Sequence, residues 1–66
     1  MPKTIEELAS MLSERDKIGY NEALAAIRNT AMEMEWAFMD GDLDKAETLL
    51  REDLGLEPDY MDLFIF

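Results

Sequence analysis

The chain has 66 residues, of which 16 are acidic and 6 are basic, so its formal net charge at pH 7 is -10. A field of that sign repels nucleic-acid phosphates and anionic membrane surfaces, which argues against direct binding to either, and it attracts basic protein surfaces. Cysteine and histidine are both absent, which excludes disulfides, thiolate and imidazole metal ligands, a cysteine nucleophile and a histidine base.

The length predicts one small helical domain spanning residues 1–66. Hydrophobic residues make up 48% of the chain and recur periodically, which distinguishes it from a disordered acidic tail. A domain of this size buries only roughly 60% of the surface that its unfolded chain exposes. Since no disulfide can stabilise the fold, self-association or binding to a partner is the remaining way for so small a domain to gain stability.

Neither a signal-peptide pattern nor an apolar run near the roughly 20 residues of a membrane span occurs in the sequence. The lack of cysteine fits a reducing compartment. We therefore expect a soluble, cytoplasmic protein without membrane contact.

A first helix is predicted to begin at Ile5. Thr4 and Glu7 have the spacing of a capping box, in which each side chain satisfies a free backbone N–H of the first turn. The charged run at residues 14–17 ends the helix or forms the turn after it. One apolar stripe precedes that run, formed by Ile5, Leu8, Met11 and Leu12.

The longest helical pattern covers residues 19–39, and we predict that the rest of the domain packs on it. Gly19 is the expected N-cap, with Asn21 as the competing cap. Alternating spacings of four and three place one set of side chains on a single face: Tyr20, Leu24, Ile27, Ala31, Met34 and Phe38. In the second half Met32, Trp36 and Met39 add another stripe, which predicts that this half is covered on two sides.

A third helix is predicted directly after the break at residues 40–42. Gly41 suits the left-handed residue that closes a helix, and Asp42 suits the next N-cap. Gly55 is the expected C-terminal cap, and Pro58 suits the first position of a final short helix or irregular tail. The expected inner face consists of Leu43, Ala46, Leu49, Leu50 and Leu54. The fold class is therefore all-α: a small single-domain bundle of three main helices plus a short C-terminal helix.

Candidate chemistry is sparse. The spacing of Asp40, Asp42 and Asp44 is that of the start of a calcium-binding loop, but the sixth position is Lys45 and the twelfth is Arg51, where glycine and a bidentate glutamate are needed. We therefore predict no metal site and no cofactor.

Two carboxylate pairs, Glu33 with Glu35 and Glu52 with Asp53, are candidates for acid–base groups. Such work needs a pocket that separates their pKa values, and residues one or two apart on a helix do not face each other. We predict no catalytic residues and a non-enzymatic protein.

The acidic charge is concentrated near the C-terminus. Residues 1–39 hold seven acidic and four basic residues (net -3), whereas residues 40–66 hold nine acidic and two basic ones (net -7). Spaced carboxylates on a compact helical body can imitate nucleic-acid phosphates and occupy a basic groove. The predicted partner-binding residues, here called the acidic segment, are Asp40, Asp42, Asp44, Glu47, Glu52, Asp53, Glu57, Asp59 and Asp62.

An alternative hypothesis assigns binding to apolar side chains. Methionine and aromatic residues off the main seam, together with the apolar C-terminal tail, would form a homodimer or dock a partner helix. The residues of this alternative are Met32, Trp36, Leu63, Phe64 and Phe66.

Three segments carry a resemblance: residues 19–24 (GYNEAL), 41–47 (GDLDKAE) and 54–60 (LGLEPDY). Together they resemble small acidic helical proteins carried by phages and other mobile elements of Gram-positive bacteria. Small acidic proteins of such elements include inhibitors of host defence, among them anti-CRISPR proteins that mimic DNA. The resemblance thus implies an inhibitor that binds a bacterial defence protein, and it assigns no site residues.

Overall fold

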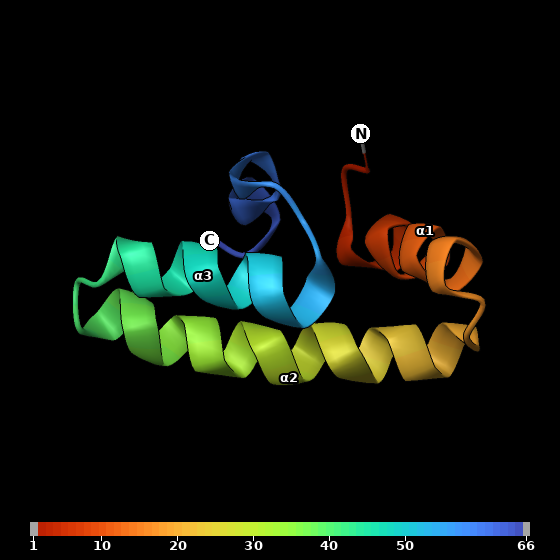
Figure 1. Ribbon diagram of the computed structural model, residues 1–66, viewed down its shortest axis with the longest axis horizontal. Helices are drawn as coiled ribbons and strands as arrows, with labels where there is room; N and C mark the ends of the chain where they lie inside the picture. The colour runs from red at the N-terminus through yellow and green to blue at the C-terminus, as the bar shows by residue number, and fades with distance from the viewer. Residues whose placement is uncertain (1, 66) are drawn as a thin grey trace.

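The computed structural model describes residues 2–65 and shows an all-α fold. Its elements are α1 (Ile5–Asp16), α2 (Tyr20–Met39), α3 (Leu43–Leu54) and a short 3-10 helix, η1 (Pro58–Leu63). This confirms the predicted bundle of three main helices plus a short C-terminal one. The 20 residues of α2 span about 30 Å at 1.5 Å per residue, nearly the whole longest extent of 33 Å. Figure 1 shows the other elements on one side of α2.

The start of α1 is set by side-chain capping. The Thr4 Oγ1 accepts a hydrogen bond from the N–H of Glu7 at 3.1 Å, as predicted. The reciprocal bond reaches one residue further back than in a capping box, because the Glu7 carboxylate accepts from the N–H of Lys3 at 2.9 Å. At the other end, Lys17 closes α1 in the left-handed conformation with φ 56°, so most of the charged run belongs to the last helical turn.

The caps around α2 and α3 lie where the sequence predicts them. Gly19 is the N-cap of α2, and Gly41 has the positive φ of 73° that suits a residue without a Cβ. The Asp42 Oδ1 accepts from the N–H of Lys45 at 3.0 Å and caps α3. Gly55 ends α3 with φ 63°, and its N–H donates to the Arg51 carbonyl at 2.9 Å, which is the bond of an αL-type helix end.

The buried seam of α2 differs from the predicted one by a small rotation of the helix. Ile27 and Met34 belong to both, but the predicted Tyr20 is exposed and Leu24, Ala31 and Phe38 are only half-buried. Small residues lie at both ends of the true seam, where they let a neighbouring helix approach the backbone closely. Its members are Ala23, Ile27, Thr30, Met34 and Ala37.

Two covers bury this seam. In Figure 1, α1 crosses the first half of α2, whereas α3 runs back antiparallel along its second half. The short connection at residues 40–42 requires that antiparallel neighbour. The remaining core residues come from α1 (Leu8, Ala9, Leu12), α3 (Ala46, Leu50, Leu54) and the C-terminal part of the chain (Leu56, Phe64).

Side-chain hydrogen bonds join α1 to the C-terminal half. The Arg15 guanidinium donates to the Leu54 carbonyl at 2.7 Å and to the Gly55 carbonyl at 3.2 Å. These carbonyls lie at the end of α3, where backbone acceptors lack helical donors and the helix dipole favours a cation. The Tyr60 hydroxyl of η1 donates to the Met11 sulfur at 3.8 Å. Arg15 therefore closes α3 as well as belonging to α1.

The second apolar stripe of α2 is not covered, contrary to the sequence prediction. Met32, Trp36 and Met39 are 60%, 69% and 80% exposed. Phe64, near the end of the chain, is buried beside Ala31 and the half-buried Phe38. These residues lie on the side of α2 next to the uncovered stripe.

Leu43, predicted on the inner face of α3, is 55% exposed. It is the first residue of that helix, next to the turn at the end of the bundle, where little of the chain remains to cover it. As for membrane spans, no helix within residues 2–65 combines the length and apolarity needed to cross a bilayer.

Candidate functional site

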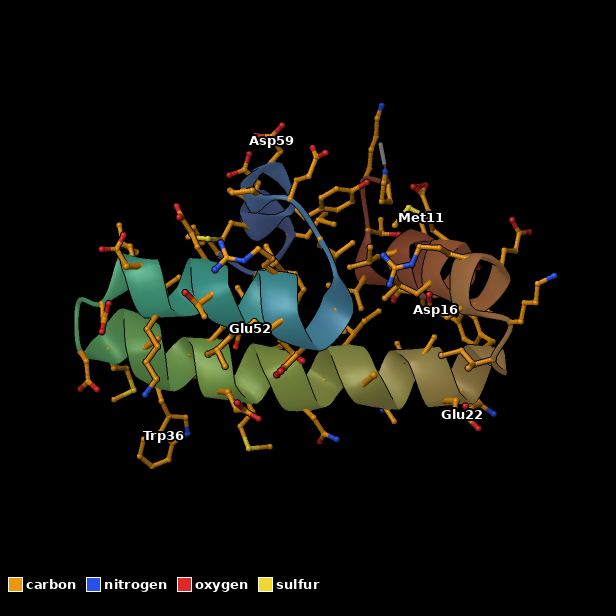
Figure 2. All side chains as sticks on the ribbon, viewed as in Figure 1. Met11, Asp16, Glu22, Trp36, Glu52 and Asp59 are labelled. Carbon is orange, nitrogen blue, oxygen red and sulfur yellow. The ribbon has the colours of Figure 1, made fainter. Side chains whose placement is uncertain are left out.

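The acidic segment extends over three parts of the structure. Its residues lie in the α2–α3 turn, along α3, and in and just before η1, and all are exposed except the half-buried Glu47. On α3 they do not share one face, because at about 100° per residue Asp44 and Asp53 point about 180° away from each other, and Glu47 and Glu52 about 140°. Figure 2 shows Glu52 and Asp59 projecting from separate parts of the molecule. The carboxylates therefore surround the C-terminal half and do not form a flat patch.

Two members of the segment have structural roles. Asp42 caps α3, and the Asp53 carboxylate accepts from the hydroxyl of the buried Thr30 at 3.4 Å, at the long end for a hydrogen bond. Within residues 2–65 the ion pair of the structure joins Arg15 to Asp16, outside the segment. Seven carboxylates of the segment thus have neither an ion pair nor a side-chain hydrogen bond in the described chain.

The Arg15–Asp16 pair lies at the last turn of α1. The Arg15 Nε and Nη2 donate to the two Asp16 carboxylate oxygens at 2.8 and 2.9 Å. This hydrogen bonding lowers the pKa of Asp16 and raises the pKa of Arg15. Asp16 thereby holds the guanidinium that caps α3, so the pair supports the fold.

The calcium-loop spacing is explained by helix ends. Asp40 is the C-cap residue of α2 and Asp42 is the N-cap of α3, and no cluster of three or more candidate metal ligands occurs within residues 2–65. The carboxylate pair on α2 is divided between two hollows, since Glu35 lines one and Glu33 lines the other.

The apolar residues of the alternative hypothesis fall into different environments. Met32 and Trp36 are exposed, whereas Phe64 is 5% exposed and contributes to the core, and Leu63 is half-buried. Phe66 lies outside the described residues. Phe64 thus places the end of the chain as a lid on the core, and the three most exposed large apolar side chains of residues 2–65, Met32, Trp36 and Met39, lie on the outer side of α2.

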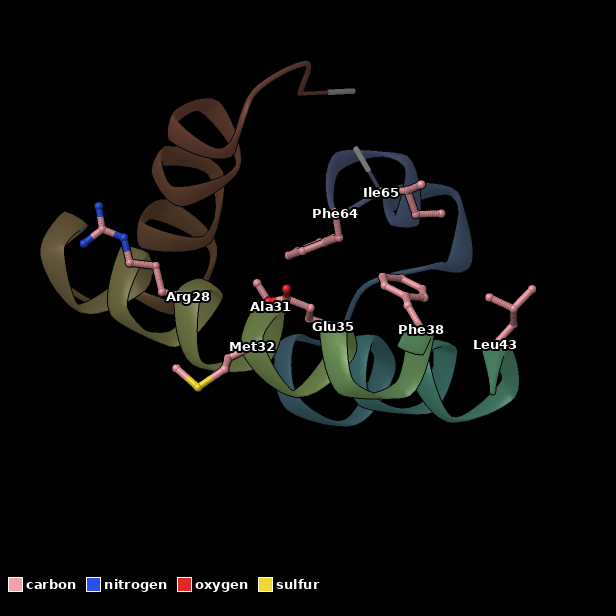
Figure 3. Close-up of a pocket in the computed structure, with 8 residues that line it drawn as sticks. All are labelled: Arg28, Ala31, Met32, Glu35, Phe38, Leu43, Phe64 and Ile65. Carbon is pink, nitrogen blue, oxygen red and sulfur yellow. The ribbon is translucent and has the colours of Figure 1, made fainter. Parts of the chain in front are cut away.

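Two open hollows flank the exposed side chains of α2. The larger, about 700 Å³, runs along α2 from Arg28 to Phe38 and on to Leu43 at the start of α3, under Phe64 and Ile65 (Figure 3). Met32 and Glu35 also line it. The smaller, about 340 Å³, is lined by Glu33, Trp36, Lys45 and Leu49. Met32 and Trp36 therefore stand on a ridge between the two hollows.

Sequence reasoning passed over Arg28 and considered Glu35 only as an acid–base candidate, because charged residues among exposed positions are usually only solvated. Their signal is a spacing of seven, which also separates Met32 from Met39. That spacing returns residues to nearly the same side of a helix.

A comparison of the chain with protein-family models, curated proteins and solved structures finds no match in any of the three. The candidate site therefore rests on the chemistry of the chain itself.

Proposed function

We propose that the chain is a non-enzymatic protein-binding module whose acidic segment engages the basic surface of a partner protein. The observation that carries this proposal is the group of seven exposed or half-exposed carboxylates without an ion pair or side-chain hydrogen bond in residues 2–65. Only Lys45 and Arg51 offset them in residues 40–66. A basic partner surface supplies the counter-charge that the chain lacks.

Solubility alone does not account for this charge. A net charge of magnitude roughly 2 to 8 suffices for a small domain, whereas this chain carries -10. Unpaired like charges also repel one another and lower the stability of the compact state. A binding role gives a reason for retaining them.

The arrangement of the carboxylates favours a concave partner. Because they lie around α3 and η1, a groove can contact more of them than a flat surface can. Proteins that hold nucleic acid in a positively charged channel, such as RNA-guided nucleases, offer such a groove. The resemblance to proteins of phages and mobile elements makes a bacterial defence nuclease the first partner to test.

The test measures binding to purified RNA-guided nucleases of Gram-positive bacteria at about 50 mM and about 500 mM NaCl, because screening lengths shorten over that range. We expect the affinity to fall at least about tenfold at the higher salt and guide–target nucleic acid to compete. Equal affinity at both salts, or no binding to any nuclease at the lower salt, would contradict the proposal.

Two charge-reversal variants with the same total charge locate the surface. The first carries Glu52→Lys, Glu57→Lys and Asp62→Lys, which leaves the structural Asp42 and Asp53 intact. The control carries Glu14→Lys, Glu22→Lys and Glu33→Lys, at exposed acidic residues outside the segment. We expect the first to abolish binding and the control to weaken it only slightly. Equal losses would mean that net charge, not the acidic segment, governs binding.

A further inference from the structure

The side of α2 that points away from the core is uncovered along its length. Nothing lies below α2 in Figure 1, and Figure 2 shows Trp36 projecting from this side into solvent. The residues of this side, here called the outward face of α2, are all exposed: Asn21, Ala25, Arg28, Asn29, Met32, Glu35, Trp36 and Met39.

The outward face of α2 is electrically neutral in a strongly acidic protein. It holds one basic and one acidic residue, Arg28 and Glu35, two uncharged asparagines and four apolar residues. Three of the latter, Met32, Trp36 and Met39, are large and more than half exposed, so their burial against a partner is favourable. This face is therefore suited to pair with a surface that is apolar and carries both charges.

The order of residues along the outward face is complementary to its own reverse. Ala25, Met32 and Met39 are seven apart, the repeat of a two-stranded helical seam. If a second α2 runs antiparallel with Met32 opposite Met32, then residue 28 lies level with residue 36, and residue 25 with residue 39. The small Ala25 then faces the long Met39 of the other copy.

The charged residues agree with the same register. Arg28 and Glu35 both line the larger hollow, so they lie on one flank of the ridge, whereas Trp36 lines the smaller hollow on the other flank. A two-fold axis perpendicular to α2 keeps each flank on its own side. Arg28 of one copy then meets Glu35 of the second, twice in the pair, and Trp36 lies on the other flank at the level of Arg28 of the second copy.

We propose that two copies of the chain pair antiparallel through the outward faces of α2, about a two-fold axis at Met32, with reciprocal Arg28–Glu35 ion pairs. A parallel pair would instead exchange the flanks, so the side that carries Arg28 and Glu35 in one copy would face the Trp36 side of the second and form no such ion pair. The pairing goes beyond the proposed function and does not depend on it, since no residue of the acidic segment lies on the outward face.

Cysteine cross-linking tests the two-fold axis, because the chain has no cysteine of its own. In the antiparallel pair the two copies of residue 32 adjoin, whereas the two copies of residue 39 lie about 21 Å apart along the axis, at 1.5 Å per residue. We expect Met32→Cys to form a disulfide dimer under mild oxidation and Met39→Cys to remain monomeric on reducing-agent-free gels. Equal cross-linking of the two variants would overturn the register.

Charge exchange tests the ion pairs. Arg28→Glu should raise the dimer dissociation constant at least about tenfold, because it opposes two carboxylates, and the double variant Arg28→Glu/Glu35→Arg should restore pairing. Light scattering during size-exclusion chromatography, at loading concentrations from about 10 µM to about 1 mM, reports the mass. Failure of the double variant to restore pairing would overturn the Arg28–Glu35 contact.

Salt separates this inference from the proposed function. Two copies of net charge -10 repel at long range, so we expect the wild-type dimer to persist at about 500 mM NaCl, where binding to a basic partner is weakened. A wild-type monomer at about 1 mM protein, at low and high salt alike, would overturn the dimer and leave the proposed function standing.

Discussion

The two faces of α2 carry similar apolar content but lie in opposite environments. The inward face is the buried seam described above, which α1 and α3 cover. On the outward face Met32, Trp36 and Met39 remain in solvent. The covered face uses small residues at both ends, which let helices approach closely, and the free face uses long ones. Hydrophobicity along a helix therefore predicts that a face needs covering, but not whether its own chain covers it.

Two methionines show the difference most directly. Met34 is 0% exposed and Met32 is 60% exposed, although they are neighbours but one on the same helix. Residues two apart point about 200° away from each other. The same side chain thus fills the core at one position and is free to contact a partner at the other.

The largest expected effect is at the inward face. Met34→Ala should lower the free energy of unfolding by about 2–5 kcal/mol, because it removes a fully buried side chain and leaves a cavity. The core of a domain of this size rarely supplies more than about 3–5 kcal/mol, so the loss is comparable with the whole stability of the fold. Urea titration followed by far-UV circular dichroism measures the change.

Met32→Ala is the matched control for Met34→Ala. At low micromolar protein we expect its free energy of unfolding to stay within about 0.5 kcal/mol of wild type, as for other exposed positions. A loss as large as that of Met34→Ala would mean that the outward face is covered in the folded chain, and the contrast between the two faces would fail.

A smaller loss of stability is expected where α1 meets the end of α3, the two helices that bury the inward face. Arg15 links α1 to the end of α3 through the carbonyls of Leu54 and Gly55. Arg15→Ala removes both donors and the cation at the helix end, and should cost about 1–2 kcal/mol in the free energy of unfolding. The same urea titration reports it.

Asp16→Asn separates the cap from the exposed ion pair, because it leaves the bonds of Arg15 to α3 in place. The lowered pKa of Asp16 means that its contribution is fully present above the ordinary carboxyl pKa and is lost as pH falls through the lowered value. We expect a small deficit relative to wild type at pH 7, which disappears at strongly acid pH. A deficit as large as that of Arg15→Ala would assign the stabilisation to the ion pair.

Helix boundaries could be predicted from the sequence because they depend on local chemistry. Each helix end in question depends on contacts within a few residues. The N-caps are Thr4, Gly19 and Asp42, and the C-cap is Gly55. The exposure of the acidic segment was foreseeable for the same reason, since unpaired carboxylates remain in water.

Contacts between helices could not be predicted in the same way. The buried seam rotated toward Ala23, Thr30 and Ala37, residues whose weak hydrophobicity hides them from a periodicity search but whose size admits a neighbouring helix. The exposure of Trp36 likewise depends on the side of α2 on which the end of the chain packs. The structural role of Asp53 depends on how α3 packs on α2. Only the tertiary arrangement distinguishes a capping or packing carboxylate from one that is free to bind.

The smallest expected effect concerns the polar residue of the inward face. Thr30 is buried at 3% exposure, and its hydroxyl reaches Asp53 only at 3.4 Å. A bond of that length contributes little, so Thr30→Val, which replaces the hydroxyl by a methyl group, should change the free energy of unfolding by less than about 1 kcal/mol, in the stabilising direction.

A double-mutant cycle with Asp53→Ala decides whether Asp53 belongs to the packing of α3 on α2. In the wild-type background Asp53→Ala leaves the buried Thr30 hydroxyl without its acceptor and should cost about 1 kcal/mol, whereas in the Thr30→Val background it should cost nothing. Equal costs in both backgrounds would show that the contact is not made in solution. Asp53 would then join the seven free carboxylates of the acidic segment, and the binding surface would reach up to α2.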